Sequence, residues 1–449
     1  LTLLILLLVF GSLVAAGLPV LTGIYTVIAA VGIVTGLTYI FDDITIYANN
    51  IVSLLGIGLS VDYSLFIVNR FREELRRGRD HKTAIAMTSA TAGRAIFFSA
   101  MTVMVGLMGM LFFENTGLPS LGWGGICATL VALVSSVVLL PAILSLLGDK
   151  INSLKVPFSM TDTNKEDGFW SWIAEGVMKR PLSVLVPAVM VLLIAGSPFL
   201  QADWGITTYK ALSPDDESRN GLELTDVYWP ENVGNTAQIV FEIGENVDPF
   251  SEENIRNLYN FSKEVLTIEH TSYVYTYAHF NSSWSQDEVI SFWDNSEEEY
   301  NEYQNFHLEN SVGDNVILVI VGIEGEQSSE DSRDVVNSIR DLESKNVQFD
   351  SQSTVSVAGI AAYNQDVLEA VAENMPIALV FILISSYILI FLQVRSVVLP
   401  LKALVMNVLS VSASFGVLVW IFQYGNGAEL LNFTPQPIDP TTPVMIFAI

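Results

Sequence analysis

The chain of 449 residues is poor in the residue types that build metal sites and covalent crosslinks. It has one cysteine, Cys127, and four histidines, which excludes an intrachain disulfide, a multi-cysteine metal site and a histidine-rich metal centre. No GxxxxGK(S/T) loop occurs, so ATP is not the evident energy source. Only 15% of the residues are charged and 51% are hydrophobic, a composition too apolar for an ordinary soluble protein or for disorder. We therefore expect no metal and no cofactor.

The formal net charge of −27 is confined to one block of the chain. Residues 201–375 contain 34 acidic and seven basic residues, whereas the rest of the chain has 14 of each. This surplus of negative charge argues against nucleic acid as a partner, because binding to phosphates needs a basic face. The neutral and apolar remainder has the composition of membrane helices, so the sequence indicates a membrane protein with one acidic, water-exposed domain.

Seven runs have the roughly 20 mostly apolar residues that a membrane-spanning helix needs. They are 18–40, 47–69, 93–113, 122–147, 182–200, 376–393 and 399–423. Shorter apolar runs at 1–10 and 439–449 resemble spans cut short, so we interpret the sequence as a piece of a longer protein. The expected organisation is transmembrane helices at 1–147, a cytoplasmic linker at 148–181, a span at 182–200, the acidic domain at 201–375 and further transmembrane helices at 376–449.

Lysine and arginine in the short loops predict the orientation, because cytoplasmic loops carry an excess of both. The basic residues gather after the second run, in the linker and in the turn at 394–398, and they are Arg70, Arg72, Arg76, Arg77, Arg79, Lys82, Lys150, Lys155, Lys165, Lys179, Arg180 and Arg395. The loops near 41–46, 114–121 and 424–438 contain acids and no base. The two kinds of loop alternate at every crossing. This pattern predicts a multi-pass protein of the cytoplasmic membrane with residues 201–375 outside the cytoplasm.

The acidic domain has the pattern of a mixed α/β fold. TAQIVFEIG at 236–244 and NVILVIVGI at 315–323 have the dense apolar and β-branched content of buried strands, and STVSVAGI at 353–360 is a third strand candidate. Ser251–Val265 and Ser329–Leu342 have the periodicity of amphipathic helices. Strands and helices in this order favour small split β-α-β layers.

Two stretches far apart in the chain are similar to each other. LLLVFGSLVAAGLPVL at the start resembles LIFLQVRSVVLPLKAL at 389–404, with Ser12 matching Ser396. Each stretch is predicted to end one span, make a tight turn and begin the next span. The residue before the matched serine differs, because Gly11 stands where the second half has Arg395. Two similar helical halves are typical of transporters.

The sharpest single feature is a carboxylate inside an apolar run. Asp62 is the only charged residue between Asp43 and Arg70, and a carboxylate at that depth costs about 2.5–3.5 kcal/mol on insertion scales. Gly58, Asp62, Phe66 and Asn69 follow helical spacing, and we expect this small and polar face to pack inward. Asp62 is therefore a candidate for an ion or proton path, and the adjacent Tyr63 could donate a hydrogen bond to it. The alternative is a structural anchor in which Asp62 pairs with Arg94 at the start of the next span.

The next predicted helix offers a complementary face. Ser99, Thr102, Gly106 and Gly109 follow the spacing three, four, three. Ser99 and Thr102 are candidates to hydrogen-bond near Asp62, and Gly58 and Phe66 on the helix of Asp62 itself are expected to surround the carboxylate. For Gly106 and Gly109 we favour plain helix packing, because small residues allow two helices to approach closely.

GIGLSVDYSLFIVNRFREELRRG, with the following GRAIFFSAMTV, closely resembles the signature of the MMPL family of the resistance–nodulation–division (RND) superfamily. LEAVAENMPIALVFILISSYILIFLQVRSVVLPLKAL is similar to the second half of such proteins. The resemblance implies twelve spans in the full-length protein and an external porter domain in each half. On that map this sequence runs from the end of span 2 to the start of span 10. The resemblance implies that Asp62 and Tyr63 form a proton relay, and a second Asp-Tyr pair is then expected about two helical turns beyond Ile449.

The resemblance also implies a function. The family exports lipids or other hydrophobic molecules using the proton gradient, so the expected partners are a hydrophobic substrate, protons and the bilayer. A transporter rather than an enzyme is expected, either a monomer or a trimer. Two alternatives share the helical scaffold of the superfamily, namely a Patched-like sterol or lipid sensor and a SecDF-like accessory of protein export. Both are less favoured, because the DYSLFIVNRFREEL run is of the MMPL kind.

Ten aromatic residues crowd into residues 273–306, among them Tyr273, Tyr275, Tyr277, Phe280, Trp284, Trp293, Tyr300 and Tyr303. They could line a route for an apolar substrate. The alternation of the three tyrosines fits one face of a strand equally well, and we favour a core role for the cluster.

Overall fold

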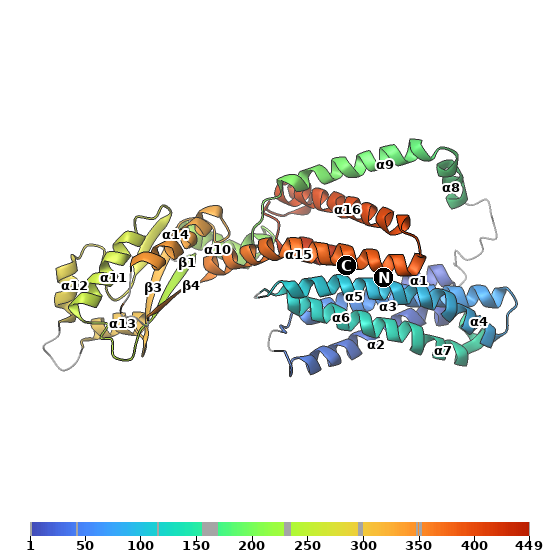
Figure 1. Ribbon diagram of the computed structural model, residues 1–449, viewed down its shortest axis with the longest axis horizontal. Helices are drawn as coiled ribbons and strands as arrows, with labels where there is room; N and C mark the ends of the chain where they lie inside the picture. Colours follow the sequence, from blue (N-terminus) through green and yellow to red (C-terminus); the bar gives the residue numbers. More distant parts are fainter. Residues whose placement is uncertain are drawn as a thin grey trace. The chain divides into compact units, whose positions relative to one another are not determined.

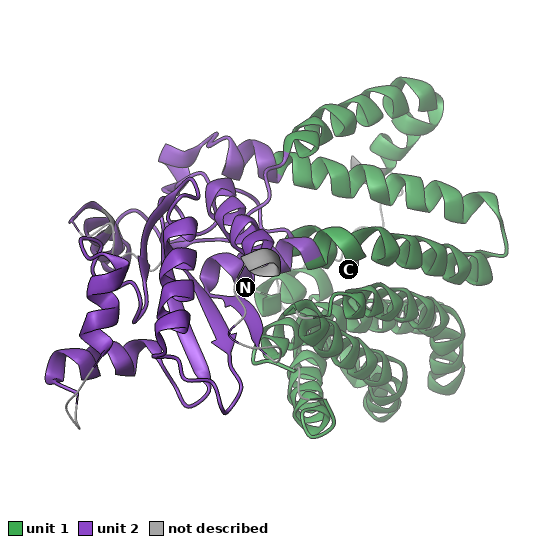
Figure 2. Ribbon diagram, turned by 60° about the vertical axis from the view of Figure 1, so that its left-hand side comes forward, with its two compact units in different colours: residues 1–201, 370–417, 441–449 green, residues 202–369, 418–440 purple. Residues whose placement is uncertain are grey.

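The computed structural model describes residues 2–41, 44–114, 116–154, 169–228, 235–294, 300–346, 349 and 353–448. The chain forms two compact units, which are coloured separately in Figure 2. The helical unit comprises Leu1–Gln201, Ala370–Val417 and Thr441–Ile449, and the α/β unit comprises Ala202–Glu369 and Leu418–Pro440. The middle of the predicted cytoplasmic linker, residues 155–168 with Lys155 and Lys165, lies outside the described residues.

The helical unit is built of helices, several of which are long (Figure 1). Its helices are α1 (Thr2–Phe10), α2 (Leu13–Leu37), α3 (Ala48–Arg76), α4 (His81–Thr88), α5 (Arg94–Met108), α6 (Leu118–Val134), α7 (Leu140–Leu147), α8 (Phe169–Lys179), α9 (Pro181–Gly196), α16 (Val398–Leu418) and α18 (Thr441–Ala448). The long helix α15 (Ile360–Val394) begins in the α/β unit and continues here. Short π-helical segments at Ser89–Gly93 and Ser135–Leu139 join α4 to α5 and α6 to α7.

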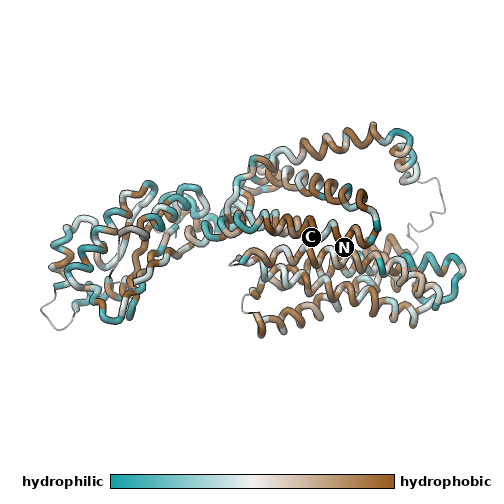
Figure 3. The backbone as a smooth tube through the Cα atoms, viewed as in Figure 1, coloured by the Kyte–Doolittle hydropathy of each residue, from teal (hydrophilic) through white to brown (hydrophobic). Residues whose placement is uncertain are grey.

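Seven helical stretches of the described residues are long and apolar enough to cross a membrane, and Figure 3 shows their hydrophobic colouring. They are Leu13–Leu37, Ala48–Arg76, His81–Phe112, Leu118–Asn152, Pro181–Gln201, Ile360–Val394 and Val398–Gln423. Each contains or overlaps one of the seven predicted spans, so the prediction of a polytopic helical membrane protein is confirmed.

The first four spanning helices pack around α6. This helix lies against α2, α3 and α5, and α3 also contacts α2. Close approach between α3 and α6 depends on Gly124, because a Cβ atom there would lie 2.7 Å from the carbonyl oxygen of Ala48. Larger side chains at this crossing would hold the two helix backbones apart.

The two similar turns have the same backbone conformation. Gly11 separates α1 from α2 with φ of +64°, and Arg395 follows α15 with φ of +56° before α16 begins. Both residues therefore lie in the left-handed region, which glycine adopts freely and arginine adopts at a cost. The shared geometry supports the internal repeat that the sequence suggested.

The α/β unit contains a four-stranded antiparallel sheet (Figure 1). Its strands are β1 (Thr236–Glu242), β2 (Thr271–Tyr275), β3 (Val316–Ile323) and β4 (Thr354–Ala358), in the order β2-β3-β1-β4. The helices between them are α11 (Glu252–Val265), α12 (Gln286–Trp293), α13 (Glu302–Ser311) and α14 (Glu330–Asn346), with α10 (Glu217–Tyr228) before β1. β3 separates β1 from β2 and β1 separates β3 from β4, which is the split β-α-β arrangement that the sequence predicted.

The core of this unit follows from the alternation along the strands. Every second residue of β1, at Ala237, Ile239 and Phe241, is fully buried, and Ile317, Val319 and Val321 repeat the pattern in β3. The amphipathic helices α11 and α14 contribute their apolar faces to the same cluster. The buried faces of the strands and the apolar faces of the helices therefore pack together in one hydrophobic core.

Part of the aromatic segment belongs to this core, whereas Tyr303 and Phe306 are exposed. Tyr277 is fully buried and donates a hydrogen bond to the carbonyl of Pro249 at 2.6 Å, and the indole of Trp293 donates to the carbonyl of Tyr277 at 3.0 Å. Phe250 lies against both rings. The preferred core role is therefore confirmed for these residues. Burial raises the pKa of Tyr277 far above its usual range, so the hydroxyl stays protonated.

Candidate functional site

Asp62 and Tyr63 lie at the middle of α3, and the structure gives them different surroundings. Tyr63 is 6% exposed, whereas Asp62 is exposed on the surface of the helical unit. Gly58, Phe66 and Asn69 are exposed as well, and a Cβ atom on Gly58 would have no neighbour within 4 Å. The prediction that this face packs inward is therefore wrong for the described part of the chain.

The opposite face of α3 explains this result. The buried side includes Ser60, Ser64, Ile67 and Phe71, which follow helical spacing and face α2 and α6. Asp62 is two residues from both serines, and two residues are about 200° around a helix. The helix therefore buries its serine face against α2 and α6, and the carboxylate points away from them.

Tyr63 and Ser99 are brought together by the packing of α3 and α5. The buried Tyr63 hydroxyl interacts with the Ser99 side chain, although the pair does not meet the geometry of a full hydrogen bond. Ser99 thus lies beside Tyr63, the residue next to Asp62, and its role as a partner of Asp62 stays a prediction. Thr102 donates back to the carbonyl of Phe98 at 2.9 Å.

The structural-anchor alternative for Asp62 gains no support. No ion pair among the described residues includes Asp62. The proposed partner, Arg94, is exposed and lies over the ring of Phe98, 5.9 Å from its centroid. Asp62 is thus a carboxylate inside a spanning helix with no basic partner in the described part of the unit.

The rest of the α5 face serves packing, as expected. A Cβ atom on Gly109 would lie 2.7 Å from the side chain of Ile382 in α15. The next turn of the same face, at Gly106, is also buried. Gly109 lies in the short 3-10 turn that follows α5, and its small size lets this turn approach α15 closely.

A buried row of hydroxyl groups joins α2, α3 and the π-helical segment after α6, and the sequence analysis did not identify it. The Thr22 and Ser64 hydroxyls are 2.8 Å apart, and Ser60 donates to Thr26 at 2.7 Å. Thr26 in turn donates to Ser135 at 3.4 Å. Thr22 and Thr26 are four residues apart, as are Ser60 and Ser64, so the matching spacing on neighbouring spans was the available signal.

The basic end of α3 is held by a buried carboxylate. Glu74 is fully buried and accepts ion pairs from Arg70 at 2.8 Å and Arg79 at 2.7 Å. Arg72 donates to Asn152 at 2.8 Å and to the carbonyl of Phe10 at 3.0 Å. Some of the arginines whose positive charge predicts a cytoplasmic loop therefore also stabilise the C-terminal end of α3.

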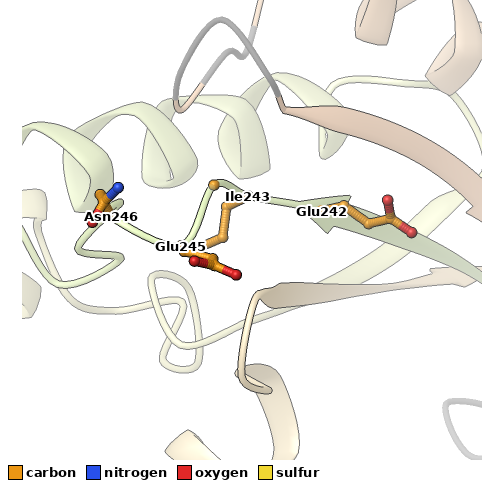
Figure 4. Close-up of a pocket in the computed structure, with 5 residues that line it drawn as sticks. Glu242, Ile243, Glu245 and Asn246 are labelled. Carbon is orange, nitrogen blue, oxygen red and sulfur yellow. The ribbon is translucent and has the colours of Figure 1, made fainter.

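A hollow of ≈370 Å³ follows β1 in the α/β unit, and Figure 4 shows the side chains that line it. It is formed by Glu242, Ile243, Gly244, Glu245 and Asn246. Glu242 accepts a hydrogen bond from Thr354 at 3.1 Å. Within the described residues, no group of three histidine, cysteine, aspartate or glutamate side chains could hold a metal ion. The hollow therefore offers the acidic side chains of Glu242 and Glu245 beside the amide of Asn246.

Comparison with known proteins identifies related membrane transporters. The model of the MMPL family matches residues 1–184 and 253–437. The chain is 28% identical, over 98% of its length, to the trehalose monomycolate exporter MmpL3 of Mycolicibacterium smegmatis, of which it covers 43%. It is 29% identical, over 97% of its length, to the protein of the same name from Mycobacterium tuberculosis, of which it covers 45%.

The chain is also similar to a second exporter and to a solved structure. The chain is 30% identical, over its whole length, to the mycolic acid-containing lipids exporter MmpL11 of M. smegmatis, of which it covers 44%. A crystal structure of SecDF from Thermus matches all of the chain and 47% of its own at 13% identity, with a TM-score of 0.49. The chain spans less than half the length of the curated relatives it matches.

Proposed function

This chain belongs to the MMPL family, and we propose that it forms part of an exporter that moves lipids or other hydrophobic molecules across the cytoplasmic membrane, driven by protons. The names of its relatives support a lipid as the substrate. The single observation that carries the proton part is Asp62. It is a carboxylate inside a spanning helix, beside the buried Tyr63, with no cation paired to it among the described residues.

An unpaired charge is costly at this depth, so a carboxylate there needs water, a proton or a partner helix. Asp62 lies on the free face of α3, where another helix of the whole protein would have access to it. We propose that the family's second Asp-Tyr pair approaches this face. Asp62 would then be the proton-binding group, Tyr63 its hydrogen-bonding neighbour, and Ser99 the group that orients the Tyr63 hydroxyl.

The available energy is sufficient for export. One proton that crosses a potential of about 150 mV releases roughly 3.5 kcal/mol. This energy can sustain a substrate gradient of roughly a few hundred-fold. Binding of the proton would remove the charge on Asp62 and so change which packing of α3 is favourable.

The proposed orientation places residues 201–375 outside the cytoplasm. Its support is the basic loops after α3 and before α9. Ser329 precedes α14 in the α/β unit, so a single cysteine there, in a Cys127→Ala background, should react with an impermeant maleimide added to intact cells. Labelling that requires broken membranes would reverse the topology.

Two substitutions test the role of Asp62 in the full-length protein. Asp62→Asn keeps the size and most of the hydrogen bonding but removes the titratable proton. The proposal expects normal abundance of Asp62→Asn in the membrane and loss of efflux. If Asp62 were an anchor, Asp62→Asn would retain much of the efflux and Asp62→Ala would lower the abundance. Normal efflux by a well-expressed Asp62→Asn protein would refute the proton-carrying role.

A further inference from the structure

A second polar site lies within the helical unit, away from the exposed carboxylate of Asp62. It is a cavity of ≈130 Å³ between α5, α15, α16 and α18. Three polar side chains from three different helices line it, namely Thr102, Ser386 and Asn407. The rest of the lining is apolar, from residues such as Ile382 and Val411. All four helices cross or enter the apolar part of the unit, so the three polar groups would lie at membrane depth.

All three polar side chains have unused hydrogen-bonding capacity. Ser386 is 8% exposed, whereas Asn407 is exposed on the helical unit, and neither side chain has a hydrogen-bond partner among the described residues. The Thr102 hydroxyl donates to the carbonyl of Phe98, which leaves its acceptor positions free. A serine inside a helix commonly donates to the carbonyl four residues before it, and Ser386 does not. An amide and a hydroxyl that face a cavity in hydrocarbon without partners are costly, so this site has the chemistry to bind a polar guest.

The volume of the cavity indicates which kind of molecule can bind in it. Water takes up about 30 Å³ in the liquid and needs two to four polar partners when it is buried. The cavity offers three polar side chains and has room for a few such molecules, whereas the acyl chain of a lipid would need a longer and wholly apolar space. We propose that water occupies this cavity and is held by Thr102, Ser386 and Asn407.

The position of Thr102 connects the proposed water site to Tyr63. Ser99 and Thr102 are three residues apart on the same face of α5, and Ser99 interacts with the Tyr63 hydroxyl. The polar groups therefore form a series from Tyr63 through Ser99 and Thr102 to the water between α15 and α16. This series is a path along which protons can reach the carboxylate from the second-half helices. That part of the proposal rests on the proposed function.

Accessibility of single cysteines tests the water site independently of transport. The chain has one native cysteine, so a Cys127→Ala background permits Ser386→Cys alone. Ser385→Cys is a matched control, because it is the neighbouring serine on α15 and does not line the cavity. Silver ions are added to membranes, and the thiols that they have not blocked are then labelled with a maleimide in detergent.

Silver ions should block Ser386→Cys at least about tenfold faster than Ser385→Cys, because a thiol in hydrocarbon has a pKa raised by a unit or more and forms tenfold less thiolate. Equal rates, or no reaction at Ser386→Cys, would show that the cavity is dry and overturn the proposal. Asn407→Cys against Ser410→Cys repeats the comparison on α16, where Ser410 lies outside the lining.

Efflux measurements test the proton path. Asn407→Leu should slow efflux by up to about tenfold, which corresponds to the typical net contribution of one intramolecular hydrogen bond, and Asn407→Gln should restore much of it. If proton entry has become limiting, acidifying the outside by about one pH unit should offset the loss, because entry is proportional to proton concentration. A purely structural defect would not respond to acid, and that result would overturn the path while the water site stood. Asp62→Asn stays inactive at every pH if the proposed function holds, so the two failures are distinguishable.

Discussion

Gly124 provides the most direct test of how the helical unit packs. A Cβ atom at this position would lie 2.7 Å from the carbonyl oxygen of Ala48 and 3.2 Å from its Cα and carbonyl carbon. All three atoms are main chain, so Gly124→Ala cannot be accommodated by rotation of a side chain. Overpacking of this kind costs about 1–3 kcal/mol. Alanine in place of glycine within a helix returns about 1 kcal/mol through its higher helix propensity.

Gly32→Ala in α2 is the matched control, because a Cβ atom there would have no neighbour within 4 Å. Gly32→Ala should gain the helix propensity of alanine without a steric clash. Gly124→Ala should therefore be about 1–3 kcal/mol less stable than Gly32→Ala, which corresponds to several degrees in the midpoint of thermal unfolding. Thermal unfolding of both variants in detergent, followed by the loss of monodisperse protein in size-exclusion chromatography, measures this difference. Equal midpoints would refute the close contact between α3 and α6.

Three other predictions follow from the same structure. Arg395→Gly should raise the free energy of unfolding by up to about 1 kcal/mol, because it removes a non-glycine residue from φ of +56°; thermal unfolding checks this. Thr26→Val should lower it by about 0.6 kcal/mol and by no more than about 1.7, since it removes the bonds to Ser60 and Ser135. Burial holds the pKa of His307 below its usual value of 6.5, so the folded state resists a proton that the unfolded state accepts. The α/β unit should therefore lose stability as the pH falls below about 6.5, and His307→Gln should weaken this dependence in urea unfolding followed by tryptophan fluorescence.

The parts of the fold that depend on local pattern could be predicted from the sequence. Apolar runs of spanning length gave the seven membrane helices, because length and hydropathy are properties of each helix alone. Dense apolar and β-branched runs predicted β1 and β3, a similar run made β4 a candidate strand, and amphipathic periodicity predicted α11 and α14. The strand β2 is harder to predict from the sequence, because it is short and its residues continue into the aromatic core. The alternation of three tyrosines is compatible with a strand there but does not require one.

The parts that depend on contacts distant in sequence could not be predicted. The sequence suggested that the face of Asp62 is buried, because polar residues in membranes usually face inward. The structure instead buries Ser60 and Ser64, whose hydroxyls find partners 34 and 42 residues away on α2. The segment 418–440 is a second case. Its link to the α/β unit includes the bond from Arg219 to Thr434 at 2.6 Å, across 215 residues.

The central claim is that proton movement through Asp62 drives export, and coupled flux in proteoliposomes tests it most directly. Full-length protein is reconstituted with a pH-sensitive dye inside, a proton gradient is imposed, and movement of a fluorescent lipid is followed together with the internal pH. The account predicts that lipid movement requires the gradient and is accompanied by proton flux, and that Asp62→Asn abolishes both. Lipid movement by Asp62→Asn at the rate of the unmodified protein, or movement that survives collapse of the gradient, would contradict it.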